Sequence, residues 1–540
     1  MVDYNIKKEG DMDVSVMAPS AMVVTPHHLA TQTAIMILRQ GGTAIEAMVA
    51  AAATIAVVYP HMNSIGGDSF WLILPPNGEP IAIDASGPAG SLADLNFFQG
   101  INKIPDKGPK SAITVAGTVA GWDAALRYLT ESGYQPMPVA NLLSDAIAYS
   151  EHGFPISSCQ AKANEIFKTR LTNFTQDFKD IFFPDGRVLK TGDLLYQKKL
   201  ANTFKDLANN GLDSFYRGTV AQSIVEDMQT LGMPITESDL FNYNAIRCRP
   251  LRLQHSHGEL LNLPPPTQGV LSLSILGMLD DLHIDGKHEG EFIHAAVEAT
   301  KQAFKLRDTY ITDPRYMNVS AQSLLSKSNI FEMASHIDLE RASPEGNGDG
   351  PGDTIWMGIM DKEGFSVSFI QSIFHEYGSG VVLPKTGILW QNRGVSFNLN
   401  PGSLRFIVPG KKPFHTLNPA AAILNDGRVM VYGTRGGDGQ PQTQTAIFHR
   451  YVVQGKNLQQ SVYDPRWAYG PFTMDPTSIL RLENRFSQET INYLKDRGHV
   501  MAMLPAFTEM VGQAGALVRH TNGVLEGAWD VRSNGFAAGF

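Results

Sequence analysis

The chain has 540 residues, of which 43% are hydrophobic and 18% charged, so it can bury a substantial core and is not a disordered segment. Its formal net charge is −9 and it contains no basic block, which argues against nucleic acid and anionic membrane surfaces as main partners. The expected partner is therefore a small molecule.

The cysteines and the N-terminal residues bear on the cellular compartment. Cys159 and Cys248 are too few and too far apart for a disulfide framework or a CxxC site, which is compatible with a reducing compartment. Residues 1–13 are charged where a secretory signal would be apolar, and the apolar stretch 44–58 is too short for a membrane span and contains Glu46. We therefore expect a cytoplasmic protein in which 44–58 forms a buried helix.

The first part of the chain predicts helices alternating with strands. Residues 31–42 (TQTAIMILRQGG) have the apolar spacing of an amphipathic helix that ends at glycine, and residues 69–87 predict two strands joined by a PNGEP turn. A longer helix is predicted over 294–311, with Glu298 and Arg307 available for its polar side. These patterns indicate a mostly helical N-terminal part.

Residues 343–353 (SPEGNGDGPGD) are predicted to form a linker between two parts of different secondary structure. This segment has too few apolar residues to bury the surface that an ordered structure would need. Beyond it, residues 354–372 predict two strands joined by a DKEG turn, and 418–437 predict a second pair joined at NDGR. We therefore expect a strand-rich C-terminal part that begins at the Asp353–Thr354 junction.

Common catalytic and cofactor motifs are missing from the sequence. It contains no GxxxxGK[ST] phosphate loop, no HExxH and no GxSxG, and the glycine clusters SIGGDSF and TRGGDG match no dinucleotide fingerprint. His27–His28 and His255–Ser256–His257 have residue types that bind metals, but histidines in polar turns are more often surface residues. We expect neither a metal nor a cofactor.

Thr354 has two interpretations that its neighbours leave open. Threonine is a favoured strand residue, so it could simply begin the strand. Cleavage before it would instead create a free α-amino group with a pKa of about 7.7–8.0, a base well placed to activate the hydroxyl as a nucleophile. The flexible linker before a rigid strand offers the geometry that such a self-cleavage needs.

Gly436 and Gly437 follow a predicted strand and also have two interpretations. Adjacent glycines let backbone N–H groups approach a ligand oxygen closely, as an oxyanion hole requires. They are equally typical of a tight turn.

Taken together, the residues resemble the γ-glutamyltranspeptidase family of N-terminal-nucleophile hydrolases. The resemblance covers nearly the whole chain and is carried, in this order, by GGTAIEAMVAAAATIAVVYPHMNSIGGDSFWLI, VAGTVAGWDAAL, GLDSFYRGTVAQSIVEDM, LNLPPPTQGVLSLSILGML, HAAVEATKQAFKLRDTYITDP, DTIWMGIMDKEGFSVSFIQS, YGSGVV and TRGGDGQPQTQ.

This resemblance implies an α+β fold, a four-layer αββα sandwich, and synthesis as a proenzyme that cleaves itself between Asp353 and Thr354. The large chain 1–353 and the small chain 354–540 would form one intertwined unit, a heterodimer of the processed chains, with its further dimerisation left open. In the family the freed threonine attacks an amide carbonyl, its own α-amino group moves the proton, and water or an amine resolves the acyl-enzyme. By position, Ser372 matches a hydroxyl residue that supports the nucleophile, and Gly436 and Gly437 match the oxyanion-hole glycines.

The sequence departs from the family at the residues that hold the glutamyl group. Ser86 falls where an arginine binds the α-carboxylate, and Phe374 replaces an asparagine. Arg393 and Ser396 stand where a glutamine and an aspartate bind the α-amino group. His415–Thr416 replace a serine pair.

These departures change the charge of the expected pocket. An aspartate that would attract an ammonium is replaced while Arg393 is added, so the pocket should repel an α-amino group and accept an anion. Arg435, beside the glycines, is expected to add to this positive charge, and Phe374 makes the space smaller and drier. We expect an amidase for a small anionic amide, with Arg393 or His415 binding its carboxylate.

The stretches FIQSIFHEYGSG and GGDGQPQTQ are similar to the branch of the family that contains oxamate amidohydrolases, which convert oxamate to oxalate and ammonia in purine ring breakdown. Three alternatives stay open. They are a γ-glutamyl hydrolase or transpeptidase acting on glutathione-like substrates, an acylase for larger acyl amides, and an uncleaved binding protein without activity.

Overall fold

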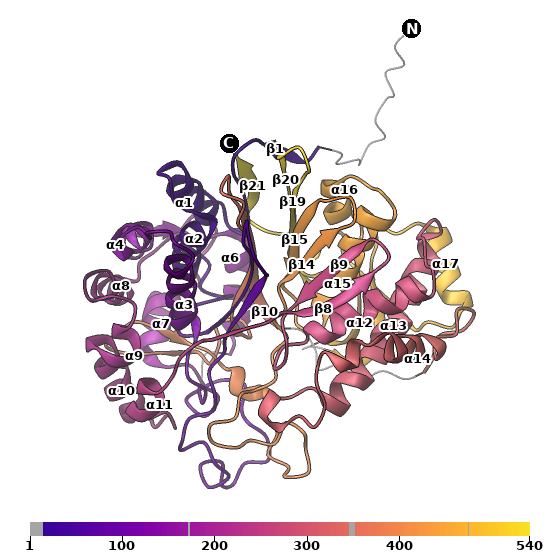
Figure 1. Cartoon of the computed structure of the whole chain (residues 1–540). Coiled ribbons are helices and arrows are strands. Elements are labelled where there is room, and N and C mark those ends of the chain that lie inside the picture. The colour runs from indigo at the N-terminus through magenta and orange to yellow at the C-terminus, as the bar shows by residue number, and fades with distance from the viewer. Residues whose placement is uncertain (1–13, 171–172, 345–351, 473–474) are drawn as a thin grey trace.

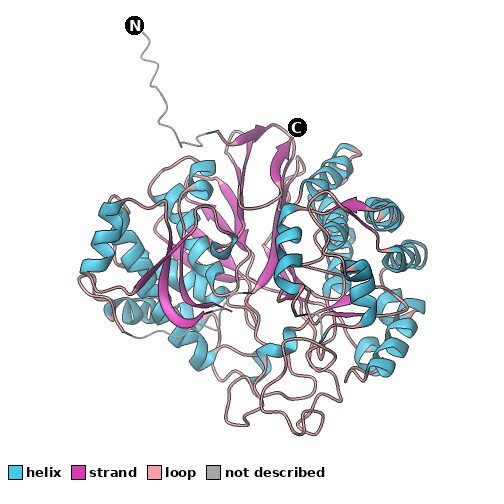
Figure 2. Ribbon diagram, turned by 180° about the vertical axis from the view of Figure 1, so that it is seen from behind, coloured by secondary structure: helices cyan, strands magenta, loops and turns pink. Residues whose placement is uncertain are grey.

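The computed structural model describes residues 14–170, 173–344, 352–472 and 475–540. Residues 345–351, which make up most of the predicted linker, lie outside these ranges. Two sheets lie side by side at the centre, with helices covering the outer face of each (Figures 1 and 2). The predicted four-layer αββα sandwich is therefore confirmed.

The first sheet joins strands from both sides of the Asp353–Thr354 junction. Its order is β21 (Phe536–Gly539), β2 (Met22–Thr25), β10 (Asp353–Met360), β11 (Ser366–Phe374), β3 (Asp68–Leu74), β4 (Ile81–Ala85) and β7 (Ile246–Cys248). All of these neighbours are antiparallel. The strand pairs predicted around PNGEP and DKEG are β3–β4 and β10–β11.

The second sheet is antiparallel too and includes the pair predicted around NDGR, β14–β15. Its order is β1 (Val16–Ala18), β20 (Leu525–Trp529), β19 (Ala514–Arg519), β15 (Val429–Thr434), β14 (Ala420–Leu424), β9 (Gly258–Asn262) and β8 (Leu251–His255).

Trp356 fills the space between the two sheets. Its indole packs against Gly433 and Gly515 of the second sheet, where an added Cβ would lie 2.2 and 2.5 Å from the ring. Side chains alternate along β10, so Ile355 and Met357 point the other way, into the core beneath the helices. Residue 354 therefore lies on the same side of β10 as Trp356, toward the second sheet.

The outer face of the first sheet is covered by α1 (His28–Arg39), α2 (Ala44–Val58) and α3 (Thr118–Glu131). Every residue of α2 is buried, as predicted, and Thr43 and Glu46 cap its N-terminus reciprocally. Because a helix without an exposed face needs no polar stripe, its residues are apolar except for Thr54 and the capping Glu46.

The second sheet is covered by α12 (Gly269–Asp281), α13 (Glu289–Tyr310), α14 (Lys327–Ser335), α15 (Gly439–Phe448) and α17 (Gln488–Asp496). The predicted helix over 294–311 is part of α13, but the expected polar side is wrong: Glu298 and Arg307 are 1% and 0% exposed. Helices α12, α14, α15 and α17 pack around α13, so its charged residues pair inside the protein.

The remaining helices and strands lie outside the two central sheets. They are α4 (Val139–Leu142), α5 (Ser144–His152), α6 (Ser158–Phe167), α7 (Gln176–Phe182), α8 (Lys198–Asn210), α9 (Ser214–Arg217), α10 (Thr219–Leu231), α11 (Glu237–Phe241), α16 (Leu458–Tyr463), β5 (Phe154–Pro155), β6 (Leu194–Leu195), β12 (Val381–Val382), β13 (Leu389–Trp390), β16 (Trp467–Phe472), β17 (Asp475–Glu483) and β18 (Met501–Leu504).

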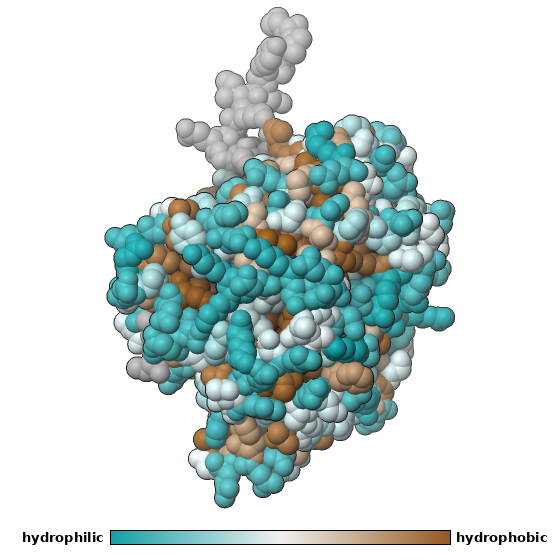
Figure 3. All heavy atoms as spheres, turned by 90° about the vertical axis from the view of Figure 1, so that its left-hand side faces the viewer, coloured by the Kyte–Doolittle hydropathy of each residue, from teal (hydrophilic) through white to brown (hydrophobic). Residues whose placement is uncertain are grey.

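The face on the left of Figure 1 carries mainly hydrophilic residues, with separate hydrophobic areas between them (Figure 3). Within the described ranges, no helix has both the length and the apolar character that a membrane crossing requires.

Candidate active site

Thr354 lies at a β-bulge near the start of β10. Asp353 pairs with Phe374 and Ile355 with Gln371, so two residues of β11, Ser372 and Ile373, lie opposite Thr354. The extra residue of this bulge belongs to β11, so β11 bends here while Thr354 keeps the alternation of β10. Thr354 is 1% exposed, and its hydroxyl donates to Ser372 Oγ at 3.3 Å. The structure thus brings the predicted nucleophile and its predicted supporting hydroxyl together.

Ser372 Oγ also accepts the Phe374 N–H at 2.8 Å, and this contact fixes the end of β11. Phe374 has a φ of +78°, a left-handed conformation that costs a bulky residue about 1–2 kcal/mol. The turn brings the Phe374 ring beneath the Arg393 guanidinium, whose Cζ lies 3.9 Å from the ring centre. Such stacking leaves the edge of the guanidinium available for an anion.

Gly436 and Gly437 connect β15 to α15 with φ values of +125° and +53°. An added Cβ at Gly436 would meet no atom within 3.5 Å, so the backbone conformation rather than space requires glycine there. Neither N–H donates to another described residue, whereas the Gly437 carbonyl accepts from Gln268 Nε2 at 2.8 Å. Gly352 packs between Phe374 and Gly437, so the residues just before Thr354 lie beside the glycine pair.

Arg393 is buried in a short 3₁₀ turn, Arg393–Ser396. Its Nε and Nη1 have no hydrogen-bond partner among the described residues. Burial lowers the pKa of Arg393 to about 9, and the negative charge of Asp68 opposes this shift. A buried cation with unused donors favours binding of an anion.

His415 is fully buried, and both of its ring nitrogens lack hydrogen-bond partners among the described residues. Its Nε2 lies 3.3 Å from Asp68 Oδ2, in a geometry that does not align a hydrogen bond. Burial lowers the pKa of His415 well below its usual value, and the cations Arg393 and Lys412 lower it further. The ring is therefore neutral in the empty site.

Asp68 begins β3 and lies opposite Ser372 in the sheet. Its Oδ1 accepts from the Gly87 and Gly117 N–H groups at 3.0 and 3.1 Å and from Gln391 Nε2 at 3.1 Å. Burial raises the pKa of Asp68 to about 7, although these donors and Arg393 act in the opposite direction. A buried carboxyl whose charge changes near neutral pH is typical of functional sites.

The other predicted site residues lie around this group. Ser86 is buried and donates to Asp84 Oδ1 at 2.5 Å, and Asp84 pairs with Lys412 Nζ at 2.7 Å. The Thr416 carbonyl accepts from Gln268 Nε2 at 2.7 Å, so the same amide holds Thr416 and Gly437 together.

Arg435 lies apart from the buried Arg393 group. Its Nη2 is 3.2 Å from Glu509 Oε2, so its charge is already balanced. Arg435, Gly436 and Gly352 line a cavity of about 960 Å³. The cavity therefore reaches Gly436 from the side of the predicted cleavage junction.

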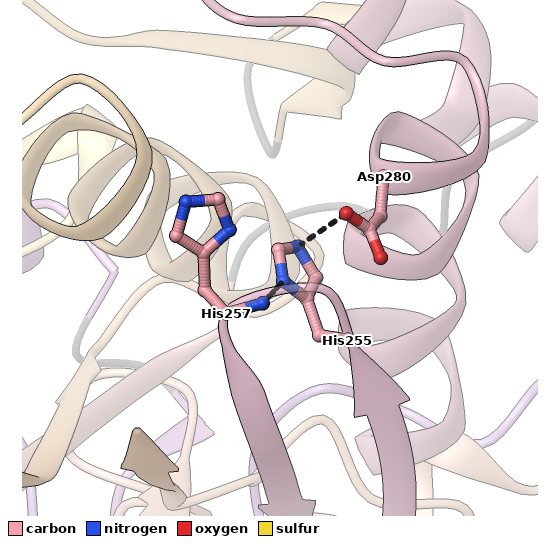
Figure 4. A group of neighbouring side chains, drawn as sticks. All are labelled: His255, His257 and Asp280. Carbon is pink, nitrogen blue, oxygen red and sulfur yellow. Dashed lines mark hydrogen bonds and ion pairs between the residues drawn. The ribbon is translucent and has the colours of Figure 1, made fainter. Parts of the chain in front are cut away.

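His255 ends β8 and His257 lies in the turn to β9, near Asp280 at the end of α12 (Figure 4). The expectation of surface histidines is wrong for His255, which is 4% exposed because it packs against Phe448. His255 Nδ1 accepts the His257 N–H at 3.1 Å, which places the ring proton on Nε2, facing Asp280 at 3.7 Å. A metal at Nε2 would need that proton removed and the turn hydrogen bond broken.

A second group of residues with metal-binding side chains is buried. It consists of His294, Glu298 and His499. His294 uses both ring nitrogens in contacts to His499 and the Asp338 carbonyl, at 2.7 and 2.8 Å. Glu298 is paired with Lys301 Nζ at 2.7 Å, whose charge disfavours a cation there. Neither group requires a metal to account for its contacts.

Sequence reasoning missed Asp68 and Gln268. Asp68 is the fifth residue of SIGGDSF (residues 64–70), and in the sequence this stretch stands out only as a glycine cluster. An aspartate that opens a strand otherwise made of buried apolar residues was the available signal, because such a charge needs a partner inside the protein.

Comparisons with known proteins agree with this geometry. The family model for gamma-glutamyltranspeptidase matches residues 30–540. The oxamate amidohydrolase proenzyme of Klebsiella pneumoniae subsp. pneumoniae is 54% identical over 98% of this chain and 100% of its own length. The glutathione hydrolase-like YwrD proenzyme of Bacillus subtilis is 36% identical over 98% and 100% of the two chains.

Among solved structures, cephalosporin acylase from Bacillus halodurans has a TM-score of 0.89 and 29% identity, covering 100% of this chain and 99% of that one. Family model, relatives and fold agree along nearly the entire length. The chain belongs to the γ-glutamyltranspeptidase family and is an amidohydrolase of the N-terminal-nucleophile type.

Proposed function

We propose that this self-processing enzyme hydrolyses the amide of a small substrate that carries a carboxylate, with oxamate as the first candidate. The observation that carries this proposal is the buried Arg393 guanidinium, which rests on Phe374 and keeps Nε and Nη1 without partners among the described residues. The relative at 54% identity is named for action on oxamate. Cytoplasmic purine breakdown is the setting that this substrate suggests.

The first step is cleavage of the Asp353–Thr354 peptide bond, which yields the chains 1–353 and 354–540 as a heterodimer. The Thr354 hydroxyl attacks the Asp353 carbonyl carbon, and water then resolves the resulting ester. This step frees the Thr354 α-amino group, whose pKa of about 7.7–8.0 suits a general base at neutral pH.

In the catalytic cycle, Thr354 Oγ1 attacks the amide carbon of the substrate while the α-amino group takes the hydroxyl proton. The N–H groups of Gly436 and Gly437 stabilise the oxyanion. The same proton passes to the leaving nitrogen, and ammonia departs from oxamate. Water then attacks the acyl ester with the α-amino group as base, which releases oxalate and restores Thr354.

Specificity follows from the charges that face the acyl group. Arg393 and His415 offer nitrogen atoms for a carboxylate close to Thr354, whereas Asp68 has one oxygen occupied by three donors and the other facing His415. The two cationic or neutral nitrogen groups outnumber the single carboxylate, whose charge is already opposed by Arg393, which disfavours the ammonium of a γ-glutamyl substrate.

A second candidate is hydrolysis or transfer of larger amides, including glutathione-like compounds. The cavity of about 960 Å³ beside Gly436 supports it, because it has room for a leaving group far larger than ammonia. The relative at 36% identity, named glutathione hydrolase-like, also favours this alternative.

The test compares the wild type with Thr354→Ala and Thr354→Ser. Intact masses report self-cleavage, and parallel assays follow ammonia from oxamate, glutamate from glutathione and amine release from glutaryl amides. We expect cleavage and oxamate hydrolysis in the wild type, neither in Thr354→Ala, and partial recovery in Thr354→Ser. Turnover of glutathione without oxamate turnover would overturn the proposed substrate class.

A further inference from the structure

Asp68 and His415 form a fully buried pair that the reaction steps above leave unused. Asp68 Oδ2 and His415 Nε2 lie 3.3 Å apart, and neither atom has a hydrogen-bond partner among the described residues. Asp68 Oδ1, in contrast, is held by three N–H donors. The unused oxygen and nitrogen thus face each other, with space between them for a shared proton.

The charge balance of the pocket gives this pair a role. In the empty site the positive charge of Arg393 is offset by the negative charge of Asp68. A substrate carboxylate bound to Arg393 adds a second negative charge to the same buried region. A net charge without a partner is costly in a protein interior, so the arrangement favours neutralisation of one carboxylate.

We propose that the Asp68–His415 pair takes up one proton when a carboxylate ligand binds to Arg393. The proton comes from solvent and lies between Asp68 Oδ2 and His415 Nε2, and no covalent bond between heavier atoms changes. The inference rests on the proposed function in requiring a carboxylate ligand. Asp68 is then a positioning residue that acts on the ligand through His415 and Arg393.

The surrounding ionisable groups are unsuited to accept this proton. Lys412 is already paired with Asp84 at 2.7 Å. Tyr216 and Tyr243 are phenols that are neutral near pH 7, because burial raises the pKa of each well above its usual value. Arg393 is the remaining charged group that acts on the pair.

The direction of the pH effect follows from the proton count. Burial raises the pKa of Asp68 to about 7, so above that pH the empty pair has lost its proton. A carboxylate that binds there must bring a proton in, and its affinity falls about tenfold for each further pH unit. Below that pH the pair is already protonated, and little uptake accompanies binding.

Calorimetric titration of the self-cleaved enzyme with oxalate tests the inference. Titrations at about pH 8 in buffers of different ionisation enthalpy give the number of protons taken up, expected to be about one for the wild type and smaller at about pH 6. In Asp68→Asn we expect uptake close to zero and less than about a twofold change in oxalate affinity over this pH range, because the amide cannot ionise.

Asp361→Asn is the matched control. Asp361 is another buried aspartate whose pKa is raised by burial, but it accepts the Ala44 and Phe365 N–H groups at the far end of β10. This variant should keep the proton uptake of the wild type. If Asp68→Asn does not fold, His415→Gln removes the partner of the shared proton, and uptake should fall there as well.

The outcomes separate this inference from the proposed function. Oxalate binding without proton uptake, or equal uptake in Asp68→Asn and the wild type, overturns the inference and leaves the small-carboxylate enzyme standing. Malonate and glutarate are titrated in parallel. If none of the three carboxylates binds and oxamate is not hydrolysed, both proposals fall.

Discussion

Thr354 and Ser372 face each other across a β-bulge, with Oγ1 and Oγ 3.3 Å apart. The bulge places two residues of β11 opposite one residue of β10, and the Phe374 N–H holds Ser372 Oγ from the other side. The proposed nucleophile is therefore positioned by β11 as well as by its own strand. Because the contact is present in the uncleaved chain, it is available to both the proposed self-cleavage and the proposed catalytic cycle.

Ser372→Ala should slow self-cleavage and kcat by about tenfold each, because the Thr354 hydroxyl loses its acceptor and a hydrogen bond of this kind contributes about 0.5–1.5 kcal/mol. Time courses of intact mass and steady-state rates measure the two effects. Ser368→Ala is the control. Ser368 lies on β11 like Ser372, but its Oγ accepts from Trp356 Nε1 and lies away from Thr354. Equal losses in the two variants would indicate a structural role for Ser372.

Gly437→Ala should lower the free energy of unfolding by about 1 kcal/mol and reduce kcat more strongly, because an L side chain disfavours the φ of +53° and any backbone shift misplaces the N–H. Gly439→Ala is the control: Gly439 begins α15 and a Cβ there meets no atom within 4 Å. Denaturant unfolding and kcat are measured for both. An alanine at 437 that leaves kcat unchanged would exclude its N–H from the oxyanion site.

Arg393→Gln should raise KM for anionic amides by at least about tenfold while self-cleavage continues, because the charge-assisted hydrogen bonds to the carboxylate are lost. Arg435→Gln should have a smaller effect, since Arg435 already pairs with Glu509 at 3.2 Å. Kinetics with oxamate and intact masses are compared for the two variants. Loss of cleavage together with binding in Arg393→Gln would assign Arg393 to the structure of the junction instead.

Much of the fold could be predicted from periodicity and turns, because the strand pairs at PNGEP, DKEG and NDGR are local. The order of family motifs identified the family correctly, and it is the basis on which Thr354 and the glycine pair are predicted as site residues. Long-range contacts could not be read in this way. The stacking of Arg393 on Phe374 depends on a positive φ at Phe374, and a bulky residue rarely predicts that conformation.

Charged residues were the main source of error. The helix pattern around Glu298 and Arg307 indicates only which residues share a face, so the helices that cover that face remained unknown until the fold was available. The substrate-binding role of Arg435 stays a prediction, but its ion pair with Glu509 could not be foreseen, because Glu509 lies 74 residues away in the chain. Asp68 was missed because its proposed role requires His415, which lies far along the chain, beyond the predicted cleavage junction.

Asp68 should also make the stability of the protein depend on pH. Burial raises its pKa from 3.8 to about 7, so the folded state binds this proton more tightly than the unfolded state. The resulting stabilisation is complete below about pH 4 and is lost as the pH rises to about 7. The free energy of unfolding of Asp68→Asn, relative to that of its parent, should therefore increase by up to about 4 kcal/mol as the pH rises from about 4 to about 7.

Denaturant unfolding of the uncleaved Thr354→Ala protein, with and without Asp68→Asn, measures this difference at several pH values on a single chain. Asp313→Asn provides a control of opposite sign: burial raises the pKa of Asp313, but hydrogen bonds from Arg315 and the Lys412 N–H lower it overall. Its relative stability should fall as the pH rises, because the parent gains from the ionised carboxylate. A constant difference between Asp68→Asn and its parent would show that Asp68 keeps its charge in the folded protein, and it would contradict the proton uptake proposed for the Asp68–His415 pair.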